Sequence, residues 1–126
     1  MTDIDATLHA YDYFHDWYVD RIVLQNESDL TCPDTLILGL KLGTRRATVT
    51  FRGMTRLGIE NGGTVNIVLS LERALPNTQL ESLAQNLLKC SLPAKRTAQH
   101  IVYLHPTAGF AIAIEFDSIL IREDTA

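Results

Sequence analysis

The chain has 126 residues, 11 basic and 15 acidic side chains and a formal net charge of −4, and this length corresponds to one domain, residues 1–126. Hydrophobic residues make up 46% of the chain and charged residues 21%, which excludes a disordered or low-complexity protein. A folded domain with its own hydrophobic core is therefore expected.

The N-terminal residues predict a helix that leads into a strand. Apolar side chains recur at helical spacing from Ile4 to Tyr11, which indicates a helix over residues 3–16. From there the apolar period changes from helical to alternating. This change predicts the first strand over residues 17–27.

The next segment predicts a hairpin of two strands. Residues 35–42 place four leucines at alternate positions, so one face of this strand is expected to be all leucine. A Gly43-Thr44 turn leads to a return strand within residues 46–52. Residues 54–59 then predict a short edge strand before the Asn61-Gly62-Gly63 turn.

The following segment predicts a strand and a second helix. Apolar side chains at alternate positions from Val65 to Leu71 predict a strand over residues 64–73, with these side chains on one face. Because the segment is so apolar, a short helix is the alternative. Thr78 stands three positions before Glu81, which is the capping-box pattern of a helix start. The second helix is expected near residues 78–90.

The last third predicts strands again. Residues 99–105 and 110–116 are expected to pair as a hairpin across a four-residue loop, and residues 119–122 to continue the second strand as a bent strand. The whole chain therefore predicts an α+β fold, with about six mostly antiparallel strands and two helices.

The sequence contains no sign of export or of a membrane anchor. Residues 1–5 lack the basic and apolar regions of a secretory signal. The longest apolar runs are strand-sized, far short of the about 20 residues that a membrane span needs. A cytoplasmic protein without membrane contact is expected.

Charge is distributed unevenly along the chain. Residues 1–34 carry eight acidic side chains and one basic one, whereas residues 35–56 carry five basic side chains and no acidic one. Either the two segments neutralise each other in the fold, or the acidic segment forms a face that meets a basic partner. The negative net charge disfavours binding to nucleic acid.

Aromatic and acidic side chains gather around the end of the predicted first helix. Some of these rings are expected in the core, and the others resemble a protein-binding hot spot among carboxylates. The candidate binding residues are Asp12, Tyr13, Asp16, Trp17, Tyr18 and Asp20.

His15 and Asp16 have two interpretations. His15 falls on the apolar stripe near the C-terminus of the predicted helix, where the helix dipole favours a protonated imidazole. This pair is therefore expected to act as a structural lock. The alternative is a polar catalytic or ligand-binding site. Its candidate residues are His9, His15, Asp16 and His100.

No metal site or cofactor is predicted. His100 and His105 are five residues apart on one strand, so their side chains should point to opposite faces. Cys32 and Cys90 lie far apart and form no metal-binding spacing. The chain also lacks the Gly-rich strand-to-helix turn of nucleotide-binding folds.

Four segments carry a resemblance to a known group of proteins. They are Phe14-His15-Asp16-Trp17, the all-leucine strand, Val49-Thr50-Phe51-Arg52-Gly53 and Phe116-Asp117-Ser118-Ile119. With the strand that contains Ile22, they resemble small uncharacterised bacterial proteins, some classed as immunity proteins of polymorphic toxin systems. The resemblance covers residues 10–75 and the final strands. It implies a protein that binds and blocks a toxin, with no catalytic residue.

Two functions of different classes therefore follow from the sequence. The favoured one is a non-enzymatic domain that binds another protein, with a homodimer through a strand edge as a further expectation. The alternative is a small enzyme or ligand-binding domain that uses the cluster near His15 and Asp16.

Overall fold

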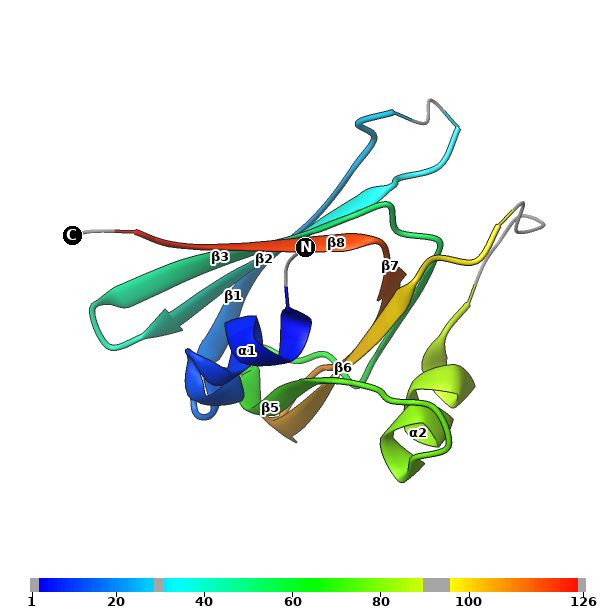
Figure 1. The fold of residues 1–126 in the computed structure, drawn as a ribbon. Coiled ribbons are helices and arrows are strands. Elements are labelled where there is room, and N and C mark those ends of the chain that lie inside the picture. The colour runs from blue at the N-terminus through cyan, green and yellow to red at the C-terminus, as the bar shows by residue number, and fades with distance from the viewer. Residues whose placement is uncertain (1–2, 29–30, 90–95, 125–126) are drawn as a thin grey trace.

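The computed structural model describes residues 3–28, 31–89 and 96–124. They form one curled antiparallel sheet with the strand order β4-β7-β6-β5-β1-β2-β3-β8, accompanied by short helices (Figure 1). The sheet-dominated α+β fold is confirmed. The expected number of about six strands is wrong, because the sheet has eight.

The elements follow the chain in an order close to the predicted one. The strands are β1 (Tyr18–Gln25), β2 (Thr35–Leu42), β3 (Arg45–Arg52), β4 (Arg56–Glu60), β5 (Ile67–Arg73), β6 (His100–Ala108), β7 (Ala111–Phe116) and β8 (Ser118–Asp124). The helices are α1 (Ile4–His9), the short 3-10 helix η1 (Asp12–Phe14) and α2 (Gln79–Leu87).

Two bends in the chain raise the strand number and curl the sheet. β3 runs into β4 through residues 53–55, and β7 runs into β8 through Asp117. β3 pairs with β8 before the bend and β4 pairs with β7 after it, so the two bent segments stay paired. The ends of the sheet are thereby brought together.

The bend is closed by a tight contact between Gly53 and Asp117. Gly53 has a left-handed φ of 71°, and a Cβ atom there would lie 2.8 Å from the Cβ atom of Asp117. The backbone N–H of Asp117 donates to the carbonyl of Arg52 at 2.9 Å. This contact between Gly53 and Asp117 therefore leaves no room for a side chain at position 53.

The inner face of the curled sheet carries the main core. Leu36, Leu38 and Leu40 of β2 are fully buried, which confirms the all-leucine face. α1 adds Ile4 and Leu8 to the same core from one side (Figure 1). The core thus joins β1, β2 and β3 to the strands beyond the bend.

The first helix is much shorter than the predicted range of 3–16. α1 ends at His9, and the three residues of η1 have left-handed φ values of 51°, 54° and 58°. Such a turn costs about 1–2 kcal/mol per residue. It points Phe14 into the core, where its ring stacks on Tyr11 at 4.9 Å and meets Trp17 at 5.2 Å. Burial of these rings offsets the cost.

β5 also departs from the predicted alternation. Its pairing with β6 shifts register between Ile67 and Ser70. As a result Val68 and Leu71 are buried, whereas Leu69 is exposed. The prediction that Val65 to Leu71 share one face is therefore wrong, because the bulge reverses the side-chain direction.

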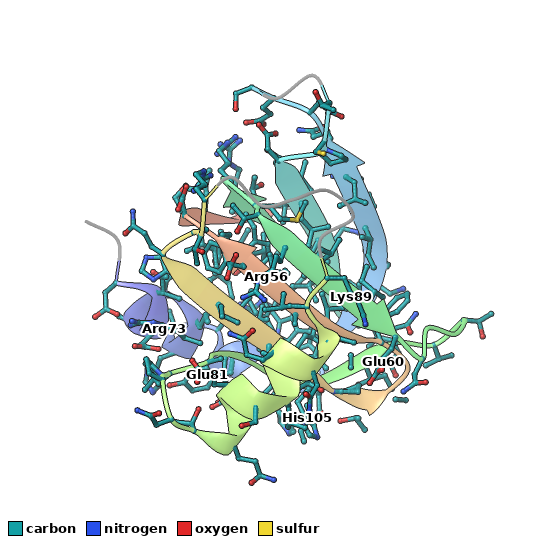
Figure 2. All side chains as sticks on the ribbon, turned by 90° about the vertical axis from the view of Figure 1, so that its right-hand side faces the viewer. Arg56, Glu60, Arg73, Glu81, Lys89 and His105 are labelled. Carbon is teal, nitrogen blue, oxygen red and sulfur yellow. The ribbon has the colours of Figure 1, made fainter. Side chains whose placement is uncertain are left out.

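α2 covers the outer side of β6 and β7, as Figure 2 shows from the helix side. Thr78 is the N-cap, as the capping-box pattern predicts, and its hydroxyl accepts from the Glu81 N–H at 3.2 Å. The Glu81 carboxylate accepts from the N–H of Asn77, one residue before the N-cap, at 3.2 Å. Ala84 of α2 is fully buried between the helix and the sheet. The helix ends at Leu87, where Leu88 turns to an extended conformation, so it is shorter than the predicted range of 78–90.

A buried carboxylate joins α2 to the strands. Glu115 is 2% exposed and accepts hydrogen bonds from the Thr55 hydroxyl at 2.5 Å and the Arg56 guanidinium at 2.6 Å. Arg56 also donates to Gln85 of α2 at 3.0 Å. Burial alone would raise the pKa of Glu115, but these hydrogen bonds outweigh it and hold the pKa below its ordinary value of 4.5.

The lowered pKa of Glu115 predicts a pH-dependent stability. A carboxylate with a lowered folded-state pKa stabilises the fold above its unfolded pKa, and this contribution is lost as the pH falls through the folded value. We expect Glu115→Gln to reduce the free energy of unfolding by about 2 kcal/mol at neutral pH. In urea unfolding, the difference from the wild type should shrink below about pH 4.5. A difference that stays constant with pH would contradict this role.

The Gly53 contact predicts a second stability effect. Gly53→Ala is expected to lower the free energy of unfolding by about 2–4 kcal/mol, because it adds a steric clash to the strain of a left-handed residue. Gly43→Ala is the matched control, since Gly43 has a φ of 60° and a Cβ atom there would meet no other atom within 4 Å. The control should lose only about 1 kcal/mol. Equal losses would show that the bend has room for a side chain.

Candidate functional site

The neighbouring strands β1 and β5 separate along most of their length. Their only pair among the described residues is Tyr18 with Ile67. Two hydrogen bonds flank it, from the Val68 N–H to the Trp17 carbonyl at 2.9 Å and from the Val19 N–H to the Asn66 carbonyl at 2.8 Å. Beyond Val19, one edge of β1 has no strand beside it in the described part of the chain.

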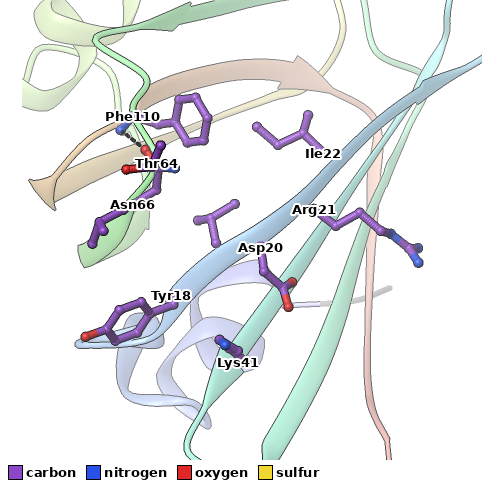
Figure 3. Close-up of a pocket in the computed structure, with 10 residues that line it drawn as sticks. Tyr18, Asp20, Arg21, Ile22, Lys41, Thr64, Asn66 and Phe110 are labelled. Carbon is purple, nitrogen blue, oxygen red and sulfur yellow. Dashed lines mark hydrogen bonds between the residues drawn. The ribbon is translucent and has the colours of Figure 1, made fainter.

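A groove lies where β1 and β5 separate, and we name it the β1 groove. Its volume is about 450 Å³. Figure 3 shows Ile22 directed toward Phe110, and Arg21 directed away from that ring. The lining residues are Tyr18, Val19, Asp20, Arg21, Ile22, Lys41, Thr64, Val65, Asn66 and Phe110.

The wall opposite β1 is held by the buried amide of Asn66. Its side-chain oxygen accepts from the N–H group of Phe110 at 3.0 Å (Figure 3). The same oxygen accepts from the Gly63 N–H at 3.3 Å, and the NH₂ group donates to the Gly63 carbonyl at 2.8 Å. A Cβ atom at Gly109 would collide with this amide. The groove is therefore preformed on this side.

The groove combines an apolar surface with a basic rim. Val65 is 53% exposed and Tyr18 is 42% exposed. Asp20 is neutralised by Arg46 at 2.8 Å, whereas Lys41 forms no ion pair with any described residue. Such a surface can bind an apolar segment that carries a carboxylate.

Five of the six predicted binding residues separate into three groups. Tyr18 and Asp20 line the β1 groove. Asp12 and Asp16 are exposed on the turn before β1 but do not line it. Trp17 is 2% exposed, so it belongs to the core; Arg45 lies over its ring at 4.9 Å.

Tyr13 is only partly available to a partner. Its side chain is half-buried against the main core. Its ring also meets His9 edge to face, with 5.8 Å between centroids. The predicted aromatic hot spot is therefore reduced to Tyr18 and the outer part of Tyr13.

His15 and Asp16 form a local, exposed pair. The His15 Nε2 atom lies 3.5 Å from the Asp16 carboxylate, and its Nδ1 atom lies 2.9 Å from the Leu69 carbonyl. The imidazole thus ties the turn to β5. The expectation that His15 lies on a buried stripe is wrong, because the left-handed turn carries it out to solvent.

The other two residues of the alternative polar site lie elsewhere. His9 packs on Tyr13, and His100 packs on Phe116 at 5.8 Å between ring centroids. His15 touches β5 beside Ser70, which pairs with His105, so His100 is on the order of 15 Å further along β6. The structure does not bring these four residues together.

The two strand histidines lie on opposite faces, as predicted. His100 is on the inner side with Phe116, and its Nδ1 atom is buried without a hydrogen-bond partner. Burial is the main cause that lowers the pKa of His100. His105 is beside Tyr103, which packs with the α2 cluster on the outer side. Within the described residues, no group of three His, Cys, Asp or Glu side chains could hold a metal ion.

The acidic and basic segments neutralise each other in part. Arg46 pairs with Asp20, and Arg52 pairs with Glu27 at 3.0 Å. Asp5 of the acidic segment lies 3.4 Å from Arg73, which is outside the basic segment. The first of the two expectations for these segments is thus supported by specific contacts.

Sequence reasoning misses the residues that complete the groove. The alternating pattern places Arg21, Ile22 and Lys41 in strands but does not indicate that they line a groove, and it predicts a buried face for Val65. Phe110 reaches the groove from another hairpin, 44 residues from Asn66. A usable signal is Asn66 after the Asn61-Gly62-Gly63 turn, because a polar residue among apolar ones needs partners.

Comparisons with protein-family models, with curated proteins and with solved structures find no match to this chain. None of the helices within the described ranges has the length and apolar character needed to cross a membrane.

The role of Asn66 predicts a stability effect. Asn66→Ala leaves the N–H groups of Gly63 and Phe110 without their acceptor, so the free energy of unfolding should fall by about 2–3 kcal/mol. Asn86→Ala on the exposed side of α2 is the control and should be neutral or slightly stabilising. Chemical denaturation measures both. An Asn66→Ala protein as stable as the wild type would show that the wall of the groove does not depend on this amide.

Proposed function

We propose that this chain is a non-enzymatic protein-binding domain that holds an extended segment of a partner in the β1 groove and blocks that partner. The observation that carries the proposal is the edge of β1 beyond Val19, which has no strand beside it among the described residues and borders an apolar groove. This is the function that the resemblance to immunity proteins of polymorphic toxin systems implies, and we place it in the cytoplasm.

The backbone of β1 supplies the first part of the argument. An unpaired strand edge presents N–H and C=O groups in a row, and an added strand satisfies them. Residues Arg21 to Gln25 of β1 already pair with β2 on their other edge. They are therefore held in the extended conformation that strand addition requires.

The side chains of the groove supply specificity. Ile22, Val65 and Phe110 form an apolar surface, and Lys41 adds a positive charge at the rim. Alternate side chains of an added segment would face this surface. An extended segment with apolar residues and a carboxylate fits these contacts.

The polar groups of the groove support binding better than catalysis. Asp20 is held by Arg46, and the Asn66 amide is committed to Gly63 and Phe110. General acid–base chemistry needs a titratable group within reach of a reacting atom. His9, His15 and His100 do not line the groove.

The proposal predicts the effect of a charge in the groove. The product of the gene immediately upstream is the partner to test, by coexpression and by calorimetric titration. Val65→Lys should weaken binding at least about tenfold, because it places a charge on the apolar surface. In coexpression with the upstream product, it should no longer protect the growth of the cells. Val65 is exposed, so the change should leave the fold intact.

Two control variants sharpen this experiment. Leu83→Lys introduces the same charge at an exposed apolar position on α2 and should bind like the wild type. His15→Ala removes the imidazole on which the enzymatic alternative depends, and it should also bind normally. Failure of the upstream product to bind at either low or high salt would refute the blocking function. Loss of function in His15→Ala alone would favour the enzymatic alternative.

A further inference from the structure

The outer side of β1, β2, β3 and β8 forms a second surface, which we name the four-strand face. The strand registers arrange its side chains in four rows. The rows are Tyr18–Lys41–Arg46–Asp124, Arg21–Gly39–Thr48–Arg122, Val23–Ile37–Thr50–Leu120 and Gln25–Thr35–Arg52–Ser118.

Neither helix packs on this face. The opposite side of the same strands carries the main core, and α1 joins that core. α2 packs with Tyr103, Ala111 and Ala113 on β6 and β7 instead. In Figure 1 both helices accordingly lie away from the four-strand face.

One row of the face is apolar. Val23, Ile37 and Thr50 are half-buried, and Leu120 at the end of the row is 44% exposed. Three apolar side chains and the methyl group of Thr50, in one row of an uncovered sheet face, are typical of a protein contact surface.

The charges on the face are mostly positive. Arg46 and Arg52 are neutralised by Asp20 and Glu27, which reach over from β1 and the residues after it. Arg21, Lys41 and Arg122 are exposed, and none of them forms an ion pair with another residue in the described ranges. Arg21 and Arg122 lie in the row next to the apolar row, and Lys41 lies in the row beyond it, which ends in the one acidic residue of the four rows, Asp124.

We propose that the four-strand face binds an acidic protein surface. The partner's apolar side chains would cover the row from Val23 to Leu120, and its carboxylates would meet Arg21, Lys41 and Arg122. The face shares Tyr18, Arg21 and Lys41 with the β1 groove, but its apolar row and Arg122 lie outside that groove, so the two surfaces can be tested separately.

Charge complementarity selects this occupant over two others. A second copy docked through the same face would oppose two positive surfaces, which is unfavourable. Single-stranded nucleic acid would require aromatic platforms for its bases, and Tyr18 is the only aromatic residue in the four rows. An acidic protein satisfies both the cations and the apolar row.

The dimensions of the face indicate a weak complex. Four strands and the spacing of the rows give about 20 Å by 14 Å. This is smaller than a standard interface of about 800 Å² per partner. A modest affinity that falls as salt rises is therefore expected.

The test uses a labelled glutamate–tyrosine copolymer, which combines carboxylates with apolar rings. Polyglutamate and duplex DNA are the comparison probes. Fluorescence anisotropy should show binding of the copolymer at low salt, at least about fivefold tighter than polyglutamate, because only the copolymer can cover the apolar row. Amide NMR shifts should map the contact to the four rows.

Variants separate the contributions of charge and apolar contact. Arg122→Glu and Leu120→Ser should each weaken copolymer binding at least about fivefold. Lys89→Glu, which makes the same charge change beyond the end of α2, should leave binding unchanged. Val65→Lys in the β1 groove should not weaken it either, which distinguishes this surface from the proposed function. Thermal unfolding checks that each variant is folded.

Several results would overturn the proposal. Tighter binding of duplex DNA than of the copolymer would assign the face to nucleic acid. If Lys89→Glu and Arg122→Glu weaken copolymer binding equally, or if the wild type does not bind the copolymer, the face has no specific affinity for an acidic protein surface. Self-association that Leu120→Ser abolishes would assign the face to a second copy of the chain.

Discussion

The crossing of Gly53 and Asp117 is the constraint on which the shape of the sheet depends. Because the two bent segments pair on both sides of this point, from Arg52 with Ser118 to Arg56 with Glu115, both segments turn together without losing their pairing. The sheet is joined much less firmly at β1 and β5, which share one pair of described residues. The β1 groove lies at this junction.

The same curl explains how a chain of net charge −4 exposes a basic face. Curling buries one side of β1, β2 and β3, so Lys41, Arg46 and Arg52 point outward, whereas Arg45 at the end of the hairpin lies over Trp17 and pairs with Glu123. Asp20 and Glu27 neutralise two of its arginines, which removes acidic charge from the N-terminal segment. What remains outside is the positive excess of Arg21 and Lys41. The net charge of the chain is therefore a poor guide to the charge of this surface.

The parts of the fold that depend on regular spacing could be predicted from the sequence. The leucine row of β2 and the capping box of α2 are local patterns with one physical outcome. The left-handed turn at Asp12 to Phe14 was not predictable, because Asp12 is a residue type that tolerates a positive φ but Tyr13 and Phe14 are not. The turn forms because the core recovers its cost through Phe14. Tertiary burial thus overrides the local helical pattern.

The candidate site was harder to predict than the fold, because its residues come from distant segments. Tyr18 and Asp20 are recognisable as aromatic and acidic residues at a helix end, but their neighbours across the groove are Val65 and Phe110. Only the register shift in β5 brings Val65 out to solvent, and a shift of one residue leaves no trace in the alternation of apolar residues. Long-range register therefore determined the part of the site that spacing could not show.

An open strand edge also carries a risk of unspecific pairing, and the edge of β1 has a feature that limits it. The pairing of β1 with β2 shifts register between Val19 and Arg21, so the strand is bulged where the groove begins. A bulge twists a strand and interrupts its regular hydrogen-bonding pattern, which disfavours a generic extended chain. A segment that binds must match both this irregular edge and the apolar wall that Asn66 fixes. The bulge in β1 that disfavours unspecific pairing at this strand edge can thereby select a specific partner.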